Sequence, residues 1–132
     1  MRTKAIVFSA LAFFAFSMPC AIAADQSQAP NPCEASKHVI GACYEVRARF
    51  YAYTMTADRL WPVGSKRELL APIPPPDAPD YHGPSEIPSP FDHDLGYFGD
   101  YRVCPLDKNI GVNKGVCIVS VKNLVVRHRD DW

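Results

Sequence analysis

Hydrophobic and polar residues alternate most regularly between Tyr44 and Ala52. The two alternating sets are Tyr44, Val46, Ala48, Phe50 and Ala52 on one side, and Glu45, Arg47, Arg49 and Tyr51 on the other. Successive side chains of a strand point to opposite faces of a sheet, so this period of two predicts a half-buried β-strand.

Two shorter strands are predicted directly downstream. The second strand, residues 57–63, is joined by a tight turn at Gly64 and Ser65 to a third strand at residues 66–70. Pro62 has no N–H to donate to a neighbouring strand. The second strand is therefore expected to lie at a sheet edge or to carry a bulge.

The C-terminal part of the chain predicts a hairpin. Residues 101–106 and 116–121 are rich in β-branched and aromatic residues, and the segment between them carries Asp, Asn and Gly residues that favour turns. Folding this run between Ile110 and Gly111 sets three pairs of residues opposite one another. These pairs are Cys104 with Cys117, Val103 with Ile118, and Tyr101 with Ser120.

A proline-rich acidic segment separates the three strands from the hairpin. Residues 69–101 contain no Lys or Arg, and they carry acids at positions 77, 80, 86, 92, 94 and 100 and prolines at positions 72, 74, 75, 76, 79, 84, 88 and 90. Proline removes hydrogen-bond donors and breaks helices, so a long extended loop over residues 71–96 is expected. Loops of this length in a compact domain are usually functional or disordered.

Together these elements predict a small all-β domain of five strands. A three-stranded meander followed by a hairpin is the strand inventory of an OB-like barrel, and an antiparallel sandwich is the alternative. The expected organisation is a signal peptide at residues 1–24, a flexible leader with Cys33 at residues 25–42, and a single β domain at residues 43–132. A chain of 132 residues is the length of one domain.

The N-terminal residues have the pattern of a secretory signal peptide. Arg2 and Lys4 precede the apolar run Ala5–Met18, which is followed by the small-x-small signal Ala21-Ile22-Ala23. The run is shorter than the ~20 residues of a spanning helix, which speaks against a retained anchor. Pro19 before Cys20 speaks against a lipoprotein signal. We therefore expect a periplasmic or secreted protein with no transmembrane segment after cleavage.

Charge excludes one class of partner. Removal of Arg2 and Lys4 with the signal leaves a slight excess of acids, because the whole chain balances 14 Lys and Arg against 14 Asp and Glu. General nucleic-acid binding needs clustered bases to neutralise phosphates, so we expect no nucleic-acid partner.

The cysteines outside the signal predict two disulfides. Cys33, Cys43, Cys104 and Cys117 remain, and four cysteines in an oxidising compartment allow three pairings. The hairpin register favours Cys104 with Cys117, and Cys33 with Cys43 follows by elimination. Reduced, buried cysteines are the alternative that a cytosolic location would favour.

Arginine and aromatic residues of the first three strands form the candidate binding set. These residues are Arg49, Tyr51, Arg59, Trp61 and Arg67. Aromatic rings and guanidinium groups together can stack on sugars or on a partner's side chains. Alternatively, the same face is covered, or its bases pair with the acidic loop, which could then act as a salt-sensitive lid.

The acidic loop also carries the candidate metal ligands. Imidazole and carboxylate together suit Zn or Cu, and the loop supplies His82, Asp92, His93 and Asp94. The alternative is that these are solvated loop residues. No Gly-x-Ser-x-Gly elbow or Cys-x-x-Cys motif is present, so we expect no nucleophilic catalysis and no cofactor.

Three segments resemble a group of small secreted bacterial proteins whose activity is uncharacterised. The group has an Arg-x-Trp-x-Val-Gly-Ser/Thr-x-Arg segment and a Gly-Asp-x-x-Val-Cys-Pro hairpin. The matching residues here are Arg59, Trp61, Val63, Gly64, Ser65 and Arg67, then Gly99, Asp100, Val103, Cys104 and Pro105. The resemblance implies a secreted bacterial protein and implies no catalytic residues.

The sequence therefore favours a secreted or periplasmic binding domain stapled by disulfides, rather than an enzyme. Its expected partner is a protein or a cell-envelope glycan. A small metal-binding protein or metal-dependent hydrolase that uses the His/Asp loop is the second hypothesis, and a structural envelope component is the third.

Overall fold

The computed structural model describes residues 28–54, 57–66, 68–88 and 92–131. The predicted signal peptide, residues 1–24, lies outside the described residues. The elements are α1 (Pro32–Ala35), β1 (Tyr44–Thr54), β2 (Ala57–Pro62), β3 (Leu70–Pro72), β4 (Leu95–Ile110), β5 (Asn113–His128) and the 3-10 turn η1 (Arg129–Asp131).

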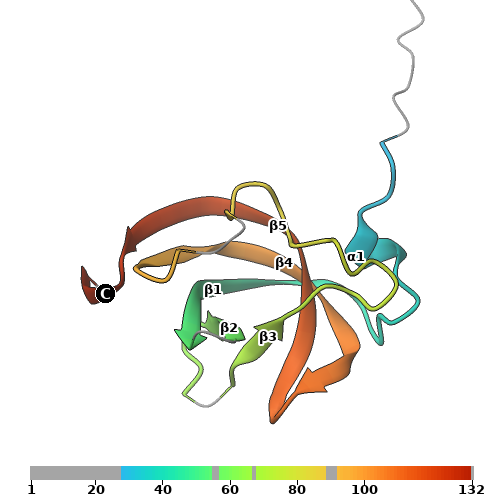
Figure 1. Cartoon of the computed structure of the whole chain (residues 1–132), viewed down its shortest axis with the longest axis horizontal. Helices are drawn as coiled ribbons and strands as arrows, with labels where there is room; N and C mark the ends of the chain where they lie inside the picture. Colours follow the sequence, from blue (N-terminus) through green and yellow to red (C-terminus); the bar gives the residue numbers. More distant parts are fainter. Residues whose placement is uncertain (1–27, 55–56, 67, 89–91, 132) are drawn as a thin grey trace, which may run out of the picture.

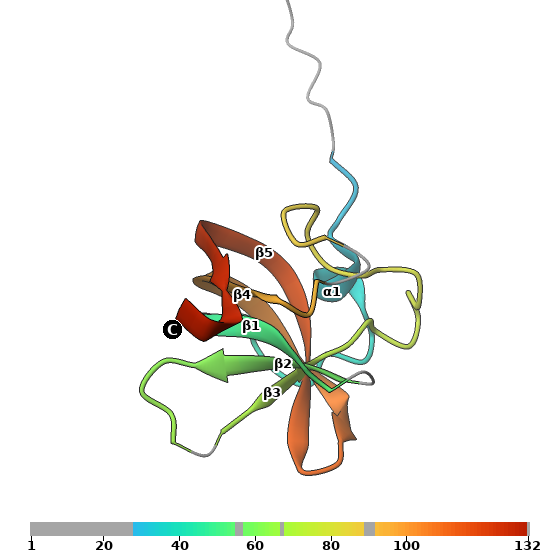
Figure 2. The same ribbon diagram turned by 60° about the vertical axis from the view of Figure 1, so that its left-hand side comes forward.

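The strands form a closed barrel in the order β1-β2-β3-β5-β4 (Figure 1). All neighbouring strands are antiparallel except β3 and β5, which are parallel. The all-β prediction is confirmed, and of its two alternatives the OB-like barrel is the one observed. As expected, the meander β1-β2-β3 precedes the hairpin β4-β5, and a loop connects the two (Figure 2).

The alternation in β1 separates the inside of the barrel from its outside. Ala48 and Phe50 are buried and pack with Leu60 of β2 in the main core. Tyr101, fully buried in the same core, donates from its hydroxyl to the Tyr97 carbonyl at 2.6 Å. Since a buried hydroxyl without a partner costs free energy, this bond allows a tyrosine inside the barrel.

The hairpin strands are longer than predicted. A nine-residue connection was expected between positions 106 and 116, but β4 and β5 continue to a tight turn at Gly111 and Val112. Gly111 has a φ of 60°, a left-handed conformation that glycine adopts without strain.

The hairpin register is correct at the cysteines and their immediate neighbours, and it is wrong further along the strands in both directions. Cys104 lies opposite Cys117 and Val103 opposite Ile118, as predicted. Tyr101, however, lies opposite Val121 instead of Ser120, because the register shifts between Arg102 and Val103. Such bulges add a residue to one strand and are not visible in the alternation alone.

The third strand is also displaced from its prediction. It occupies Leu70–Pro72, whereas residues 66–70 were expected. Leu70 pairs with Leu60 of β2 on one side and with Lys114 of β5 on the other. The long-range parallel pairing with β5, which local sequence does not encode, determines where this strand lies.

The segment from Asn31 to Ala42, which lies within the predicted leader at residues 25–42, is packed on the hairpin. Its helix α1 is capped by Asn31, whose Oδ1 accepts from the Cys33 N–H at 2.9 Å. Further along, the Ile40 N–H donates to the Pro105 carbonyl at 3.0 Å, and the Asp107 N–H donates to the His38 carbonyl at 2.9 Å. The hairpin therefore has a second layer on its outer face.

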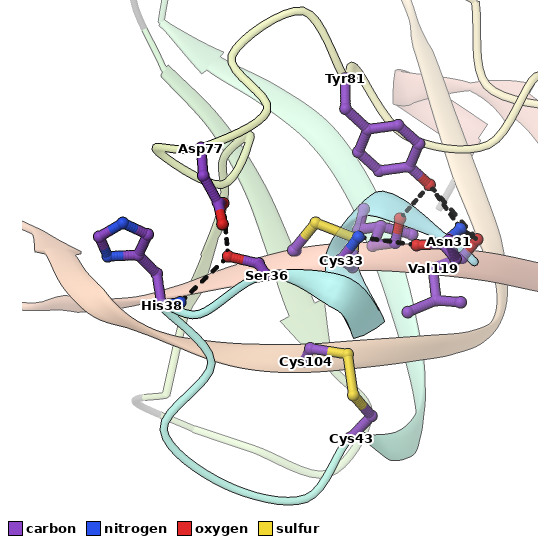
Figure 3. Close-up of a disulfide and its surroundings, with 11 residues drawn as sticks. Asn31, Cys33, Ser36, His38, Cys43, Asp77, Tyr81, Cys104 and Val119 are labelled. Carbon is purple, nitrogen blue, oxygen red and sulfur yellow. Dashed lines mark hydrogen bonds between the residues drawn. A yellow bond between two sulfur atoms is a disulfide. The ribbon is translucent and has the colours of Figure 1, made fainter. Parts of the chain in front are cut away.

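The two disulfides join this segment to the hairpin, so the predicted pairing is wrong. Cys33 is bonded to Cys117 and Cys43 to Cys104 (Figure 3). Cys104 and Cys117 do lie opposite each other, as the register required. They form part of a second core with Leu106 and Cys33, in which the N-terminal segment supplies a separate partner for each cysteine.

The proline-rich loop is held against the same layer and the end of the barrel. Asp77 accepts a hydrogen bond from the Ser36 hydroxyl at 2.6 Å, and the Tyr81 hydroxyl donates to the Ile118 carbonyl at 2.8 Å (Figure 3). The Ile73 N–H donates to the Val116 carbonyl at 2.9 Å. The described part of the proline-rich loop thus runs from β3 past α1 and back towards β4 (Figure 1).

Tryptic digestion without reduction tests the disulfide pairing directly. Cleavage after Lys37, Arg47, Arg102, Lys108 and Lys114 leaves each cysteine in its own peptide. We expect mass spectrometry to find the peptide with Cys33 linked to the one with Cys117, and the peptide with Cys43 linked to the one with Cys104. A linkage between the Cys104 and Cys117 peptides would contradict the structure.

Removal of either bridge is expected to destabilise the barrel, because both close long loops of the unfolded chain. The sequence separations are 84 residues for Cys33–Cys117 and 61 for Cys43–Cys104. Paired serine substitutions should each lower the free energy of unfolding by about 2–5 kcal/mol. Denaturant titration of the oxidised protein and the two double variants measures this effect, and unchanged midpoints would contradict it.

Candidate functional site: an arginine and aromatic face

The outer face of β1 and β2 brings together four of the five predicted binding residues. Arg49 lies opposite Trp61, and Tyr51 lies opposite Arg59. All four are offset by one residue from the core positions Phe50 and Leu60, so their side chains leave the barrel on its outer side. The fifth residue, Arg67, lies outside the described residues.

The guanidinium of Arg49 lies over two neighbouring aromatic rings of this face. Its guanidinium carbon lies 5.2 Å from the centre of the Tyr51 ring and 5.7 Å from that of Trp61. The two ring centres are 6.4 Å apart. Tyr51 is only 6% exposed, whereas Trp61 is 37% exposed, so Trp61 presents the accessible ring.

The orientation of Trp61 is fixed by its own hydrogen bond. The indole N–H donates to the Ser65 carbonyl at 2.9 Å. Gly64, with a φ of 80°, makes the turn that returns the chain to that position. A ring held in this way loses little conformational entropy when a ligand stacks on it.

Three more residues extend the face, and two of them come from distant parts of the sequence. Arg47 lies with its guanidinium 5.0 Å from the centre of the Phe98 ring, which belongs to β4. The guanidinium carbon of Arg129 in η1 lies 5.5 Å from the centre of the Tyr51 ring. We call the whole set the Arg–aromatic face; its members are Arg47, Arg49, Tyr51, Arg59, Trp61, Phe98 and Arg129.

The alternation in β1 already pointed to Arg47, since it shares a strand face with Arg49. Phe98 and Arg129 could not be found in this way. Phe98 enters through its pairing with Arg49 across β1 and β4. Arg129 is placed by the hydrogen bond from its N–H to the Asp94 carbonyl at 2.9 Å.

A shallow depression of about 200 Å³ lies within the Arg–aromatic face. Its walls are Arg49, Trp61, Pro62, Val63, Gly64 and Phe98. The walls are apolar except for one guanidinium. This combination suits a flat apolar surface that carries a negative charge at its edge.

In the alternative interpretation of this face, the acidic loop acts as a lid over it. Asp77 of that loop contacts the N-terminal segment instead. It accepts hydrogen bonds from the Ser36 hydroxyl and from the Lys37 N–H, at 2.6 and 3.2 Å. The Ser36 bond, followed by the Lys37 bond, lowers the pKa of the Asp77 carboxyl. Asp100, at the start of the hairpin, does pair with Arg47, at 3.4 Å.

The predicted metal residues do not come together as one group. His82 lines a cavity at the end of the barrel, while Asp92, His93 and Asp94 lie in an exposed turn where the Asp94 N–H donates to Asp92 Oδ1 at 2.9 Å. Within residues 28–131, apart from the undescribed positions, no group of three or more His, Cys, Asp or Glu side chains is arranged to hold a metal ion.

That cavity has a volume of about 120 Å³ and lies between the barrel end and the proline-rich loop. Its lining includes Asp58, a residue that the sequence did not single out. Burial raises the pKa of the Asp58 carboxyl, and the charges of His93 and Arg59 only partly oppose this shift. A half-buried carboxyl in a partly enclosed cavity is a second candidate site.

No protein-family model, curated protein or solved structure matches this chain. The helices among the described residues are all too short or too polar to cross a membrane. The two disulfides are compatible with an extracellular or periplasmic location.

Replacement of Asp58 by Asn is expected to raise the free energy of unfolding at neutral pH. Since the folded-state pKa of Asp58 is raised, the folded protein holds this proton to a higher pH than the unfolded chain. The associated stability is present at low pH and is lost as the pH rises through the folded-state pKa. Asn has no ionisable carboxyl, so the Asp58→Asn variant does not lose this stability as the pH rises.

Denaturant titrations of wild type and Asp58→Asn between about pH 3 and pH 8 measure the difference. It should grow with pH, whereas the exposed Asp80→Asn variant should follow wild type. An Asp58→Asn protein that is less stable than wild type at neutral pH would contradict the prediction.

Proposed function

We propose that the protein is a secreted or periplasmic binding domain, stabilised by disulfides, whose Arg–aromatic face captures an acidic glycan of the cell envelope. The observation that carries this proposal is the guanidinium of Arg49, which lies over Tyr51 and the accessible ring of Trp61 beside a shallow depression. The predicted signal peptide and the resemblance to a group of small secreted bacterial proteins support the proposed location.

Stacking prepares Arg49 to bind an anion. A guanidinium that lies over aromatic rings keeps its delocalised charge and has less freedom to lose on binding. Its planar donor groups match the two oxygens of a carboxylate. An acidic sugar whose ring stacks on Trp61 would bring its carboxylate within reach of Arg49.

The size and shape of the depression favour a glycan over a protein partner. Specific protein interfaces bury about 800 Å² on each partner and need a substantial apolar centre. Here the apolar part of the face is confined to a few residues around Trp61, within a depression of about 200 Å³. One or two sugar rings fit such a site, and neighbouring arginines can follow charges along the polymer.

Binding to a uronic-acid-containing envelope polysaccharide tests the proposal, with the carboxyl-reduced polymer as its neutral counterpart. Trp61→Ala and Arg49→Ala should each weaken binding of the acidic polymer about tenfold or more, which corresponds to ~1.4 kcal/mol. Affinity should also fall as salt is raised, because the contacts are exposed and screened.

Arg102→Ala is the matched control. It removes an arginine whose Nε bonds the Glu34 carboxylate at 3.0 Å, and an exposed ion pair of this kind contributes little to stability. Binding should be unchanged in this variant. Equal affinity for the acidic and the neutral polymer, or capture of an envelope protein through Trp61 in place of the glycan, would overturn the proposal.

A further inference from the structure

The cavity at the barrel end is a site distinct from the Arg–aromatic face. Phe50 and Ile118 form its floor as part of the barrel core, and the proline-rich loop forms its walls. The loop residues that line it include Ile73, Tyr81, His82, Gly83 and Ile87, together with several prolines. The fold thus closes one end of the barrel with a chain that has few N–H groups to satisfy.

Hydrogen bonds to β5 hold the first part of these walls, residues 73–81, against the barrel. The Ile73 N–H donates to Val116, and the Tyr81 hydroxyl donates to Ile118 at 2.8 Å. Beyond Tyr81, the Ile87 N–H donates to the Pro84 carbonyl at 3.1 Å and turns Ile87 into the core. Proline also restricts the backbone of the loop, so the cavity is largely formed before any ligand enters.

Asp58 gives the cavity its negative charge. Of the described residues that line it, Asp58 alone carries a carboxyl and His82 alone an imidazole. Asp58 lies opposite Ala52, a buried residue, while its neighbour Arg59 lies opposite Tyr51 on the outer face. The strand alternation therefore sends an acid into the cavity and a base to the Arg–aromatic face.

We propose that this cavity binds a small organic cation, an alkylamine with a body of about four carbon atoms, whose ammonium group pairs with the Asp58 carboxylate. The proline and isoleucine side chains of the walls would hold the alkyl body, and burial would strengthen the ion pair relative to one in water. The volume of about 120 Å³ suits this size, since an engineered cavity of about 150 Å³ holds a benzene molecule.

The surrounding charges give the site a direction of pH dependence. His82 lines the cavity, and His93 and Arg59 act on Asp58 through their charge. Deprotonation of Asp58 favours a cation as pH rises. Affinity should therefore increase from acidic to mildly basic pH and fall again only where the amine loses its proton, near pH ~10.

Titration with n-butylamine, followed in amide proton and nitrogen spectra at about pH 8, tests the proposal, and n-butanol serves as the neutral probe. The amine should give saturable shifts at Gly83, Ile87 and Ile118 and should bind at least tenfold more tightly than the alcohol. In Asp58→Asn the amine should bind no better than the alcohol. Asp80→Asn, which removes an exposed acid of the same loop, should behave like wild type.

Three results would overturn the inference: no saturable shift at the cavity, equal affinity of wild type for butylamine and butanol, or an Asp58→Asn protein that keeps the preference for the amine. The second comparison uses wild type alone, so it holds even if the variant does not fold. None of these results depends on glycan binding at the Arg–aromatic face.

Discussion

The attachment of the N-terminal segment to the outer face of the β4–β5 hairpin is the constraint on which the rest of this structure depends. Cys104 and Cys117 lie opposite each other there, and each is bonded to a cysteine of the segment that precedes β1. This arrangement encloses a second core outside the barrel. It also anchors the proline-rich loop, because Ser36 and Asn31 of the same segment contact Asp77 and Tyr81.

With the loop anchored in this way, the alternation of inward and outward residues in β1 and β2 produces the two candidate sites. Inward residues fill the barrel and reach the cavity at its end, where the anchored loop provides the opposite wall. Outward residues place Arg49 and Trp61 on the Arg–aromatic face. One pair of strands thus presents an acid, Asp58, to a partly enclosed cavity and bases to an open surface, and the barrel wall separates the two charges.

The sequence was most informative where structure is local. The period of two in β1, the meander and the strand register that places Cys104 opposite Cys117 were all predicted from neighbouring residues. It failed where distant segments meet. The hairpin register and elimination predict the wrong disulfide partners, because packing of α1 on the hairpin decides them. Phe98 and Arg129 reach the face only because β4 and η1 pack beside β1. Asp58 lines a cavity only because the proline-rich loop, which follows β3, packs over the end of the barrel.

Localisation of an acidic oligosaccharide on the protein tests the central claim most directly. The measurement is the shift of the Trp61 indole and Arg49 side-chain N–H resonances during titration with a uronic-acid oligosaccharide. The account predicts saturable shifts at these two groups and at Phe98, with the hairpin tip unaffected. Saturable binding that leaves the Trp61 and Arg49 resonances unchanged would contradict it.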